Sequence, residues 1–121
     1  WDLAGSGFRG LHLHLDESVD EVRLAADDVA ESMTAIQAIP DGRAATVAAD
    51  SQVEPIDGGV LPTDKATVMI QERLEGVANR IKATLDEVDE YDHLSNDMLI
   101  GIATGLEKHA WMLRVSAEEQ A

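Results

Sequence analysis

The sequence predicts an all-α fold in which amphipathic helices form one domain. Along three long segments, apolar residues recur at alternating steps of three and four, the spacing of a helix with one buried face. No segment shows the alternation of apolar and polar residues that marks a half-buried strand. Aromatic residues make up only 3% of the 121 residues, a balance that favours helices packed through aliphatic side chains. This length fits a single domain, residues 1–121.

The first long helix is expected from Phe8 to about Ile36, after a turn with two glycines in residues 1–7. Its apolar stripe consists of Leu11, Leu15, Val19, Val22, Ala26, Val29, Met33 and Ile36. The Pro-Asp-Gly sequence at residues 40–42 ends the helix.

A long connection follows, because residues 39–62 contain all three prolines and three of the glycines. A short extra helix is expected within it, from Arg43 to Ala49. The second long helix then begins at Thr63, its candidate N-cap, and runs to about Tyr91. The third long helix is expected to begin at Ser95.

Three apolar faces suffice for a small core, but the chain begins with a turn at Trp1 rather than with Met. We therefore expect that the chain is truncated at its N-terminus and that a first helix is missing. With that helix the fold would be a four-helix bundle.

The formal net charge of −15 restricts the function classes. An acidic surface repels nucleic acid, whose binding requires Lys and Arg, and attracts metal cations. Solubility alone is the other explanation of the charge. The absence of cysteine excludes disulfides, thiolate metal sites and cysteine nucleophiles. No apolar run is long enough to span a membrane, and no signal peptide is visible.

Two pairs of candidate metal ligands lie on the first long helix. His12 and Asp16 are four residues apart, as are Asp27 and Glu31, so the members of each pair are neighbours. At about 100° per residue, all four side chains fall within an arc of roughly 100° on one face. Asp16 and Asp27 are separated by roughly 16 Å along the axis, too far for one ion to join them. The helix therefore offers two half-sites.

The two pairs share one midpoint, between Glu21 and Val22. If a second copy of the helix packs antiparallel about that midpoint, each half-site meets the complementary half-site of the other copy. A two-fold axis would then create two equal sites, each with one imidazole and three carboxylates. Such a ligand set suits iron, manganese or zinc. The alternative is a solvated acidic helix face that binds no metal.

The residues along the chain also resemble the signature of the Dps family (DNA-binding proteins from starved cells). The signature has a Trp, a Gly and a Phe, then Leu-His, then Asp, and finally Asp-x-x-Ala-Glu. The matching positions lie in residues 1–8 and at Leu11, His12, Asp16, Asp27, Ala30 and Glu31. Residues 96–100 and 106–114 also match the family, and residues 39–43 resemble its actinobacterial branch. The resemblance covers nearly the whole chain.

The resemblance implies a ferritin-like four-helix bundle that assembles into a cytoplasmic, homo-oligomeric shell of twelve subunits. Ferroxidase centres at its two-fold interfaces would oxidise Fe(II) with hydrogen peroxide or oxygen, and the iron would be stored as ferric mineral, which protects against oxidative stress. His12 and Asp16 would come from one subunit and Asp27 and Glu31 from its neighbour. The family has a further His directly before the Trp that matches Trp1, a position outside this sequence.

The resemblance gives two further residues a possible role. Trp1 matches a Trp beside the centre that donates electrons and intercepts radicals; packing is its alternative role. Asp97 matches an acidic residue that lines the pores through which iron enters, and Asp92 or Asp86 is a candidate to assist it. The alternative for Asp97 is an interaction with the helix dipole.

Other expectations concern partners and rival functions. The family's DNA binding relies on basic tails, so the acidic C-terminus predicts no DNA binding by this segment. His14 is expected to be exposed and His109 to be a packing residue. Two rival functions stay open: a metal-dependent hydrolase that uses the same four ligands, and a structural helical module.

Overall fold

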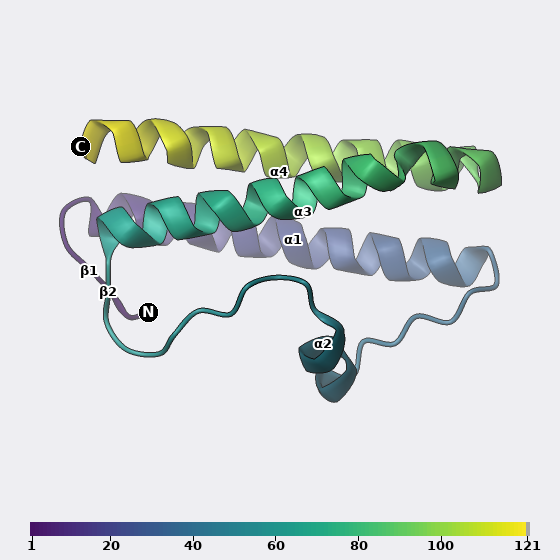
Figure 1. Ribbon diagram of the computed structural model, residues 1–121, viewed down its shortest axis with the longest axis horizontal. Coiled ribbons are helices and arrows are strands. Elements are labelled where there is room, and N and C mark those ends of the chain that lie inside the picture. Colours follow the sequence, from purple (N-terminus) through teal and green to yellow (C-terminus); the bar gives the residue numbers. More distant parts are fainter. Residues whose placement is uncertain (121) are drawn as a thin grey trace.

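The computed structural model describes the backbone of residues 1–120 and the side chains of residues 1–118. Three long helices, α1 (Phe8–Ala35), α3 (Thr63–Tyr91) and α4 (His93–Gln120), lie side by side (Figure 1). The short helix α2 (Ala44–Asp50) stands apart from them on the connection between α1 and α3. The all-α expectation is confirmed, and the observed bounds of α1, α2 and α3 differ by one residue at most from the expected ones.

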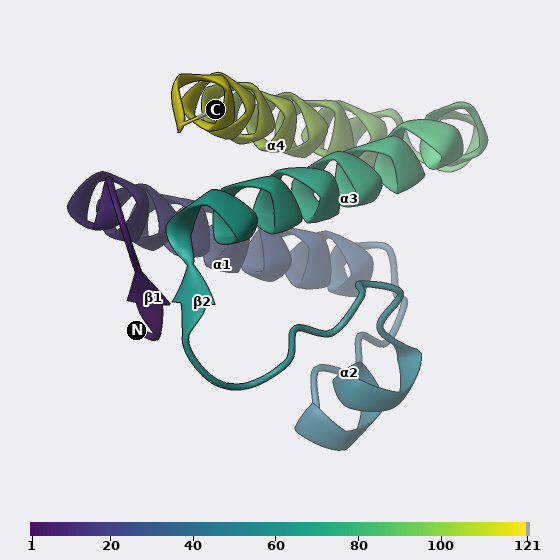
Figure 2. The same ribbon diagram turned by 60° about the vertical axis from the view of Figure 1, so that its left-hand side comes forward.

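Two very short strands were not expected from the sequence. β1 (Leu3–Ala4) pairs in parallel with β2 (Leu61–Pro62), and the two lie next to each other at the start of α3 (Figure 2). The hydroxyl of Thr63 adds a hydrogen bond of 2.7 Å to the carbonyl of Ser6. A Cβ on Gly5 would lie 2.8 Å from that hydroxyl oxygen, so this contact requires glycine. The pairing fixes residues 1–7 beside α1.

The helix α4 begins two residues earlier than the sequence indicated. Only Asp92 separates it from α3, and one carboxylate oxygen of Asp92 accepts a hydrogen bond of 3.1 Å from the amide of Ser95. This is the bond of an N-cap residue to the third residue of its helix, so Asp92 rather than Ser95 caps α4. The hydrogen bonds from Ser95 lower the pKa of the Asp92 carboxyl. The tight turn makes α3 and α4 an antiparallel pair that packs along its length.

The closed part of the core lies at one end of the bundle, where the two strands meet the helices. Leu11 of α1, Ala66 of α3 and Leu113 of α4 are buried together there. Partly buried leucines from both strands, Leu3 and Leu61, pack against them. This end therefore holds α1 against the pair formed by α3 and α4.

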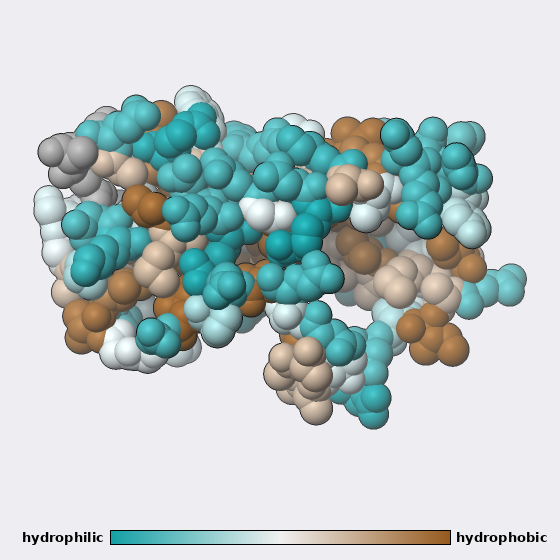
Figure 3. Space-filling view, viewed as in Figure 1, coloured by the Kyte–Doolittle hydropathy of each residue, from teal (hydrophilic) through white to brown (hydrophobic). Residues whose placement is uncertain are grey.

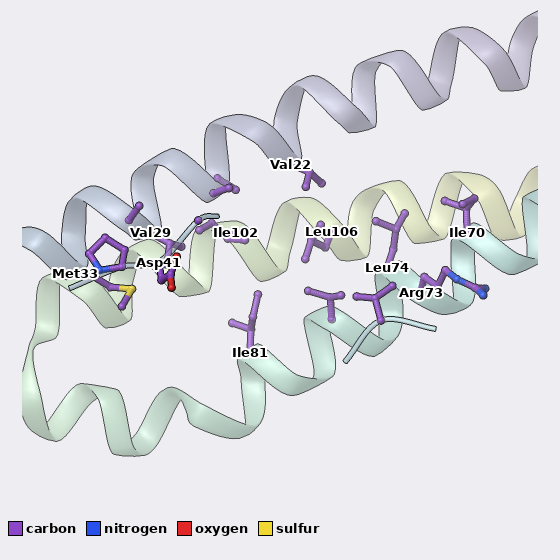
Figure 4. A pocket seen from close by; sticks show the side chains of 17 residues that line it. Val22, Val29, Met33, Asp41, Ile70, Arg73, Leu74, Ile81, Ile102 and Leu106 are labelled. Atoms are coloured by element: carbon purple, nitrogen blue, oxygen red, sulfur yellow. The ribbon is translucent and has the colours of Figure 1, made fainter. Parts of the chain in front are cut away.

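Farther along, the apolar faces of the three long helices line an open groove of about 680 Å³. Val22 and Val29 of α1 and Leu74 of α3 point into it, together with Leu106 of α4 (Figure 4). Brown apolar side chains are visible in the hollows above α2 in Figure 3. Half of the apolar stripe of α1, namely Val22, Ala26, Val29 and Met33, thus lines a groove rather than a closed core. Among the described residues, no helix is both long enough and apolar enough to cross a membrane.

Candidate metal centre

The first half-site lies near the start of α1, where an imidazole and a carboxylate are one turn apart. Nε2 of His12 is 3.8 Å from Oδ2 of Asp16. The ring of Phe8, one turn earlier, stacks on the imidazole with centroids 5.4 Å apart and planes inclined by 18°. This stacking restricts the imidazole to the Asp16 side of the helix. Both ligand side chains remain accessible, with exposed fractions of 36% and 68%.

A depression of about 580 Å³ opens beside this half-site. Trp1, His12 and Asp16 line it, together with Asp20 and Arg23. The Trp1 side chain is fully exposed, so it does not pack in the core of its own chain, which was the alternative role for this residue. Trp1 instead stands at the edge of the depression that contains the predicted ligands.

The second half-site lies about three turns farther along α1, counted from Asp16 to Asp27. Asp27, Asp28 and Glu31 each offer a carboxylate oxygen, and these atoms lie within 4.8 Å of one another. All three side chains are exposed. The structure thus brings Asp27 and Glu31 together, as their spacing predicted, and adds Asp28. Asp28 was not singled out from the sequence, although its position next to Asp27 was a usable signal.

Within one chain the two half-sites stay apart. They lie on the same helix, and the eleven residue steps from Asp16 to Asp27 span roughly 16 Å along its axis. Neither half-site alone offers the mixture of imidazole and several carboxylates expected at an iron centre. The ligand types of the two half-sites, taken as one set, would fit iron, which would be bound as the substrate of oxidation.

A hydrogen-bonded network on the opposite face of α1 fixes how the helix is rotated. Nε2 of His109, a buried residue of α4, is 2.8 Å from a carboxylate oxygen of Glu21. Its other ring nitrogen, Nδ1, is 2.8 Å from Nε2 of His14 and 3.3 Å from the hydroxyl of Ser18. His109 is therefore a packing residue with satisfied hydrogen bonds, as expected.

The expectation that His14 is exposed was wrong, because the side chain is partly buried against His109. Burial, and secondarily the nearby His109, lower the pKa of the His14 imidazole. At about 100° per residue, the three network residues of α1 are centred roughly 150° from the predicted ligands. By binding this side of α1 to α4, the network leaves the ligand face pointing away from the bundle.

Asp97 lies beyond the first turn of α4, which contains no acidic residue. The helix dipole acts mainly on charges within the first turn, so the alternative interpretation of Asp97 loses support. The side chain is exposed and lines a groove of about 420 Å³ together with Glu21 and Asp28 of α1. Its role in a pore depends on neighbouring subunits and stays a prediction.

Comparison with known proteins places this chain in a family. The ferritin-like domain model matches residues 1–119. DNA protection during starvation protein 2 of Deinococcus radiodurans is 30% identical over 114 residues, which cover 94% of this chain and 47% of that protein. The DNA protection during starvation protein of Mycolicibacterium smegmatis is 26% identical over 98% of this chain and 64% of its own length. The chain thus spans about half to two thirds of these relatives.

Solved structures of Dps proteins share the fold. Dps92 from Deinococcus radiodurans superposes with a TM-score of 0.91 at 30% identity, covering 95% of this chain and 70% of that one. Dps from Microbacterium arborescens, solved in a high iron form, gives a TM-score of 0.89 at 28% identity, covering 96% and 76%. The chain belongs to the ferritin-like domain family, and its relatives among known proteins and structures include Dps proteins.

Proposed function

We propose that this protein oxidises and stores iron, using ferroxidase sites that two subunits complete together. The observation that carries the proposal is the arrangement of α1: two ligand clusters on one outward face, equally distant from a common midpoint. Two antiparallel copies of α1 would then form two equal sites. In each, His12 and Asp16 of one subunit would meet Asp27 and Glu31 of the other.

The proposed reaction is the oxidation of Fe(II) by hydrogen peroxide. Each ferrous ion loses one electron, and one peroxide accepts two electrons as its O–O bond breaks. Two ferrous ions are therefore consumed per peroxide, and with two waters they yield two ferric oxyhydroxide units and four protons. The carboxylates favour the reaction because hard oxygen ligands bind Fe(III) better than Fe(II). Consuming peroxide in this way protects against hydroxyl radicals.

We propose in addition that the ferric product is stored as mineral in a dodecameric shell in the cytoplasm. The family membership supports this assembly. The apolar groove between α1, α3 and α4 supports a four-helix subunit, because a fourth helix from an upstream segment would bury its lining. Acidic side chains such as Asp97 would attract ferrous ions toward the interior.

The proposal is tested by anaerobic titration with Fe(II), followed by hydrogen peroxide. We expect saturable Fe(II) binding and then ferric absorbance, with two ferrous ions consumed per peroxide. Hydrolysis of amide or ester substrates without a change in the oxidation state of iron would instead favour the metal-dependent hydrolase. Absence of metal uptake would favour the third hypothesis, a structural helical module that binds no metal.

A further inference from the structure

The stretch of α1 between the two half-sites carries an exposed pair of opposite charges. Asp20 and Arg23 are both exposed, and neither forms an ion pair with any side chain in residues 1–118. Arg23 is the only Lys or Arg between His12 and Glu31. Arg23 is thus a single cation in the middle of an acidic helix face with no ion-pair partner among the described side chains, and it is available to a second molecule.

The symmetry of the ligand pairs identifies that partner. Asp20 and Arg23 are equally distant from the midpoint between Glu21 and Val22, the same midpoint that relates the two half-sites. An antiparallel arrangement that joins the half-sites therefore also brings Asp20 of each copy near Arg23 of the other. Asp20 and Arg23 each lie within about 3 Å of the midpoint, measured along the helix axis. Two helices that cross at the midpoint are closest to each other there.

The helix geometry also places both charges on the ligand face. At about 100° per residue, Asp20 and Arg23 fall inside the arc of roughly 100° that the four ligands occupy. The exposed apolar side chains Val19 and Leu24, with exposed fractions of 46% and 67%, lie at the two edges of this arc. The face therefore has ionic groups at its centre and apolar groups beside them, a composition that suits contact with another protein surface.

The ion pairs between Asp20 and Arg23 would offset the repulsion between two acidic helix faces. Without metal, two faces that each carry Asp16, Asp27 and Glu31 repel each other. Like charges that approach across an interface disfavour association unless opposite charges are interleaved. Arg23 carries a permanent positive charge that can offset this repulsion while the two chains associate, before any metal ion is bound.

We infer that Asp20 and Arg23 form two reciprocal ion pairs across the two-fold axis, which fix the register of the α1 helices before iron binds. The occupant of this face is a second copy of the same chain. The inference rests on the proposed function, since it assumes the same antiparallel contact. Asp20 and Arg23 are positioning residues: they align the two half-sites and do not touch the metal.

The test uses the charge-reversal variants Asp20→Arg and Arg23→Asp, studied without metal. Each homodimer would contain two like-charged contacts and should dissociate at least about tenfold more readily than the wild type. Mixing the two variants creates a dimer in which both contacts are again between opposite charges. We expect this mixed dimer to be tighter than either homodimer, measured by fluorescence energy transfer between labelled subunits and by sedimentation.

Mixing leaves all contacts within a chain unchanged, so the rescue would distinguish an intermolecular pair from one within α1. It also excludes an effect of net charge alone, because Asp20→Arg reduces the negative charge of the face and would then give the tightest homodimer. The double variant Asp20→Arg/Arg23→Asp should associate as the wild type does. The control mixture, Glu87→Arg with Lys65→Asp on α3, should show no preference for mixed dimers.

A mixed dimer that is no tighter than the homodimers would overturn the inference. The same outcome would leave the proposed function standing if the wild type still oxidised iron at a shared site. Conversely, tight mixed dimers of a protein that takes up no iron would support the ionic register and contradict the ferroxidase proposal. The register of the two α1 helices is measured separately from association, in concentrated samples where all variants are dimeric. Anaerobic Fe(II) binding should be weaker in each single variant than in the wild type and should recover in the double variant.

Discussion

A carboxylate oxygen of Glu21 on α1 lies 2.8 Å from Nε2 of His109 on α4, and this contact joins the two helices. The carboxylate accepts a hydrogen bond from Nε2–H of His109, and in that tautomer Nδ1 of His109 accepts a hydrogen bond from Nε2 of His14. This contact connects fold and function, because it fixes the side of α1 that faces the bundle and thus the side that presents the ligands.

Replacing His109 by Leu should lower the free energy of unfolding by about 1–3 kcal/mol, since it leaves the partly buried His14 without its partner. Chemical denaturation followed by circular dichroism measures this change. Replacement of the exposed neighbour Lys108 by Ala is the matched control and should have little effect. A His109→Leu protein as stable as the wild type would show that the network does not hold α1 in place.

The imidazole of His93 should titrate above its ordinary pKa because Asp89, one turn earlier, accepts a hydrogen bond from it. Since the pKa is raised in the folded state, this pair stabilises the fold below the unfolded pKa of about 6.5. The stabilisation is lost as the pH rises through the folded value. NMR titration of the His93 ring should show the raised pKa in the wild type and a value near the ordinary one in Asp89→Asn.

Replacing Asp97 by Asn should slow iron uptake by about two- to fivefold at low salt, because it removes a charge that attracts Fe(II). The difference should shrink at high ionic strength, which screens exposed charges. Stopped-flow absorbance at low Fe(II) concentration measures the rate. The exposed Glu72→Gln change removes the same charge from α3 and serves as control; equal effects of the two variants would argue against a specific entry route at Asp97.

Replacing Trp1 by Phe should leave iron oxidation intact but raise the yield of hydroxyl radicals. An indole gives an electron to a hydroxyl radical and converts it to hydroxide, whereas a benzene ring is much harder to oxidise. Spin trapping during peroxide-driven iron oxidation measures the radical yield. An unchanged yield in Trp1→Phe would remove Trp1 from the proposed radical-intercepting role.

The sequence was sufficient for the features that depend on local periodicity. The bounds of α1 and α3 followed from apolar spacing, and the proximity of Asp27 to Glu31 followed from the helical turn. It was insufficient where distant residues meet. The β1–β2 pairing involves two residues per strand and leaves no periodic signal. The contact between His14 and His109 joins residues 95 positions apart, so no local pattern announces it.

The claim that two subunits share each iron site is tested most directly by mixing two inactive proteins. The variant His12→Ala/Asp16→Ala lacks one half-site, and Asp27→Ala/Glu31→Ala lacks the other, so neither should oxidise iron rapidly by itself. A dimer with one subunit of each kind contains one complete site, and random mixing should restore about one quarter of the wild-type rate. Co-purification through a tag on one variant verifies that mixed assemblies have formed. If such mixed assemblies remain as inactive as their parents, the ligands do not meet across the interface.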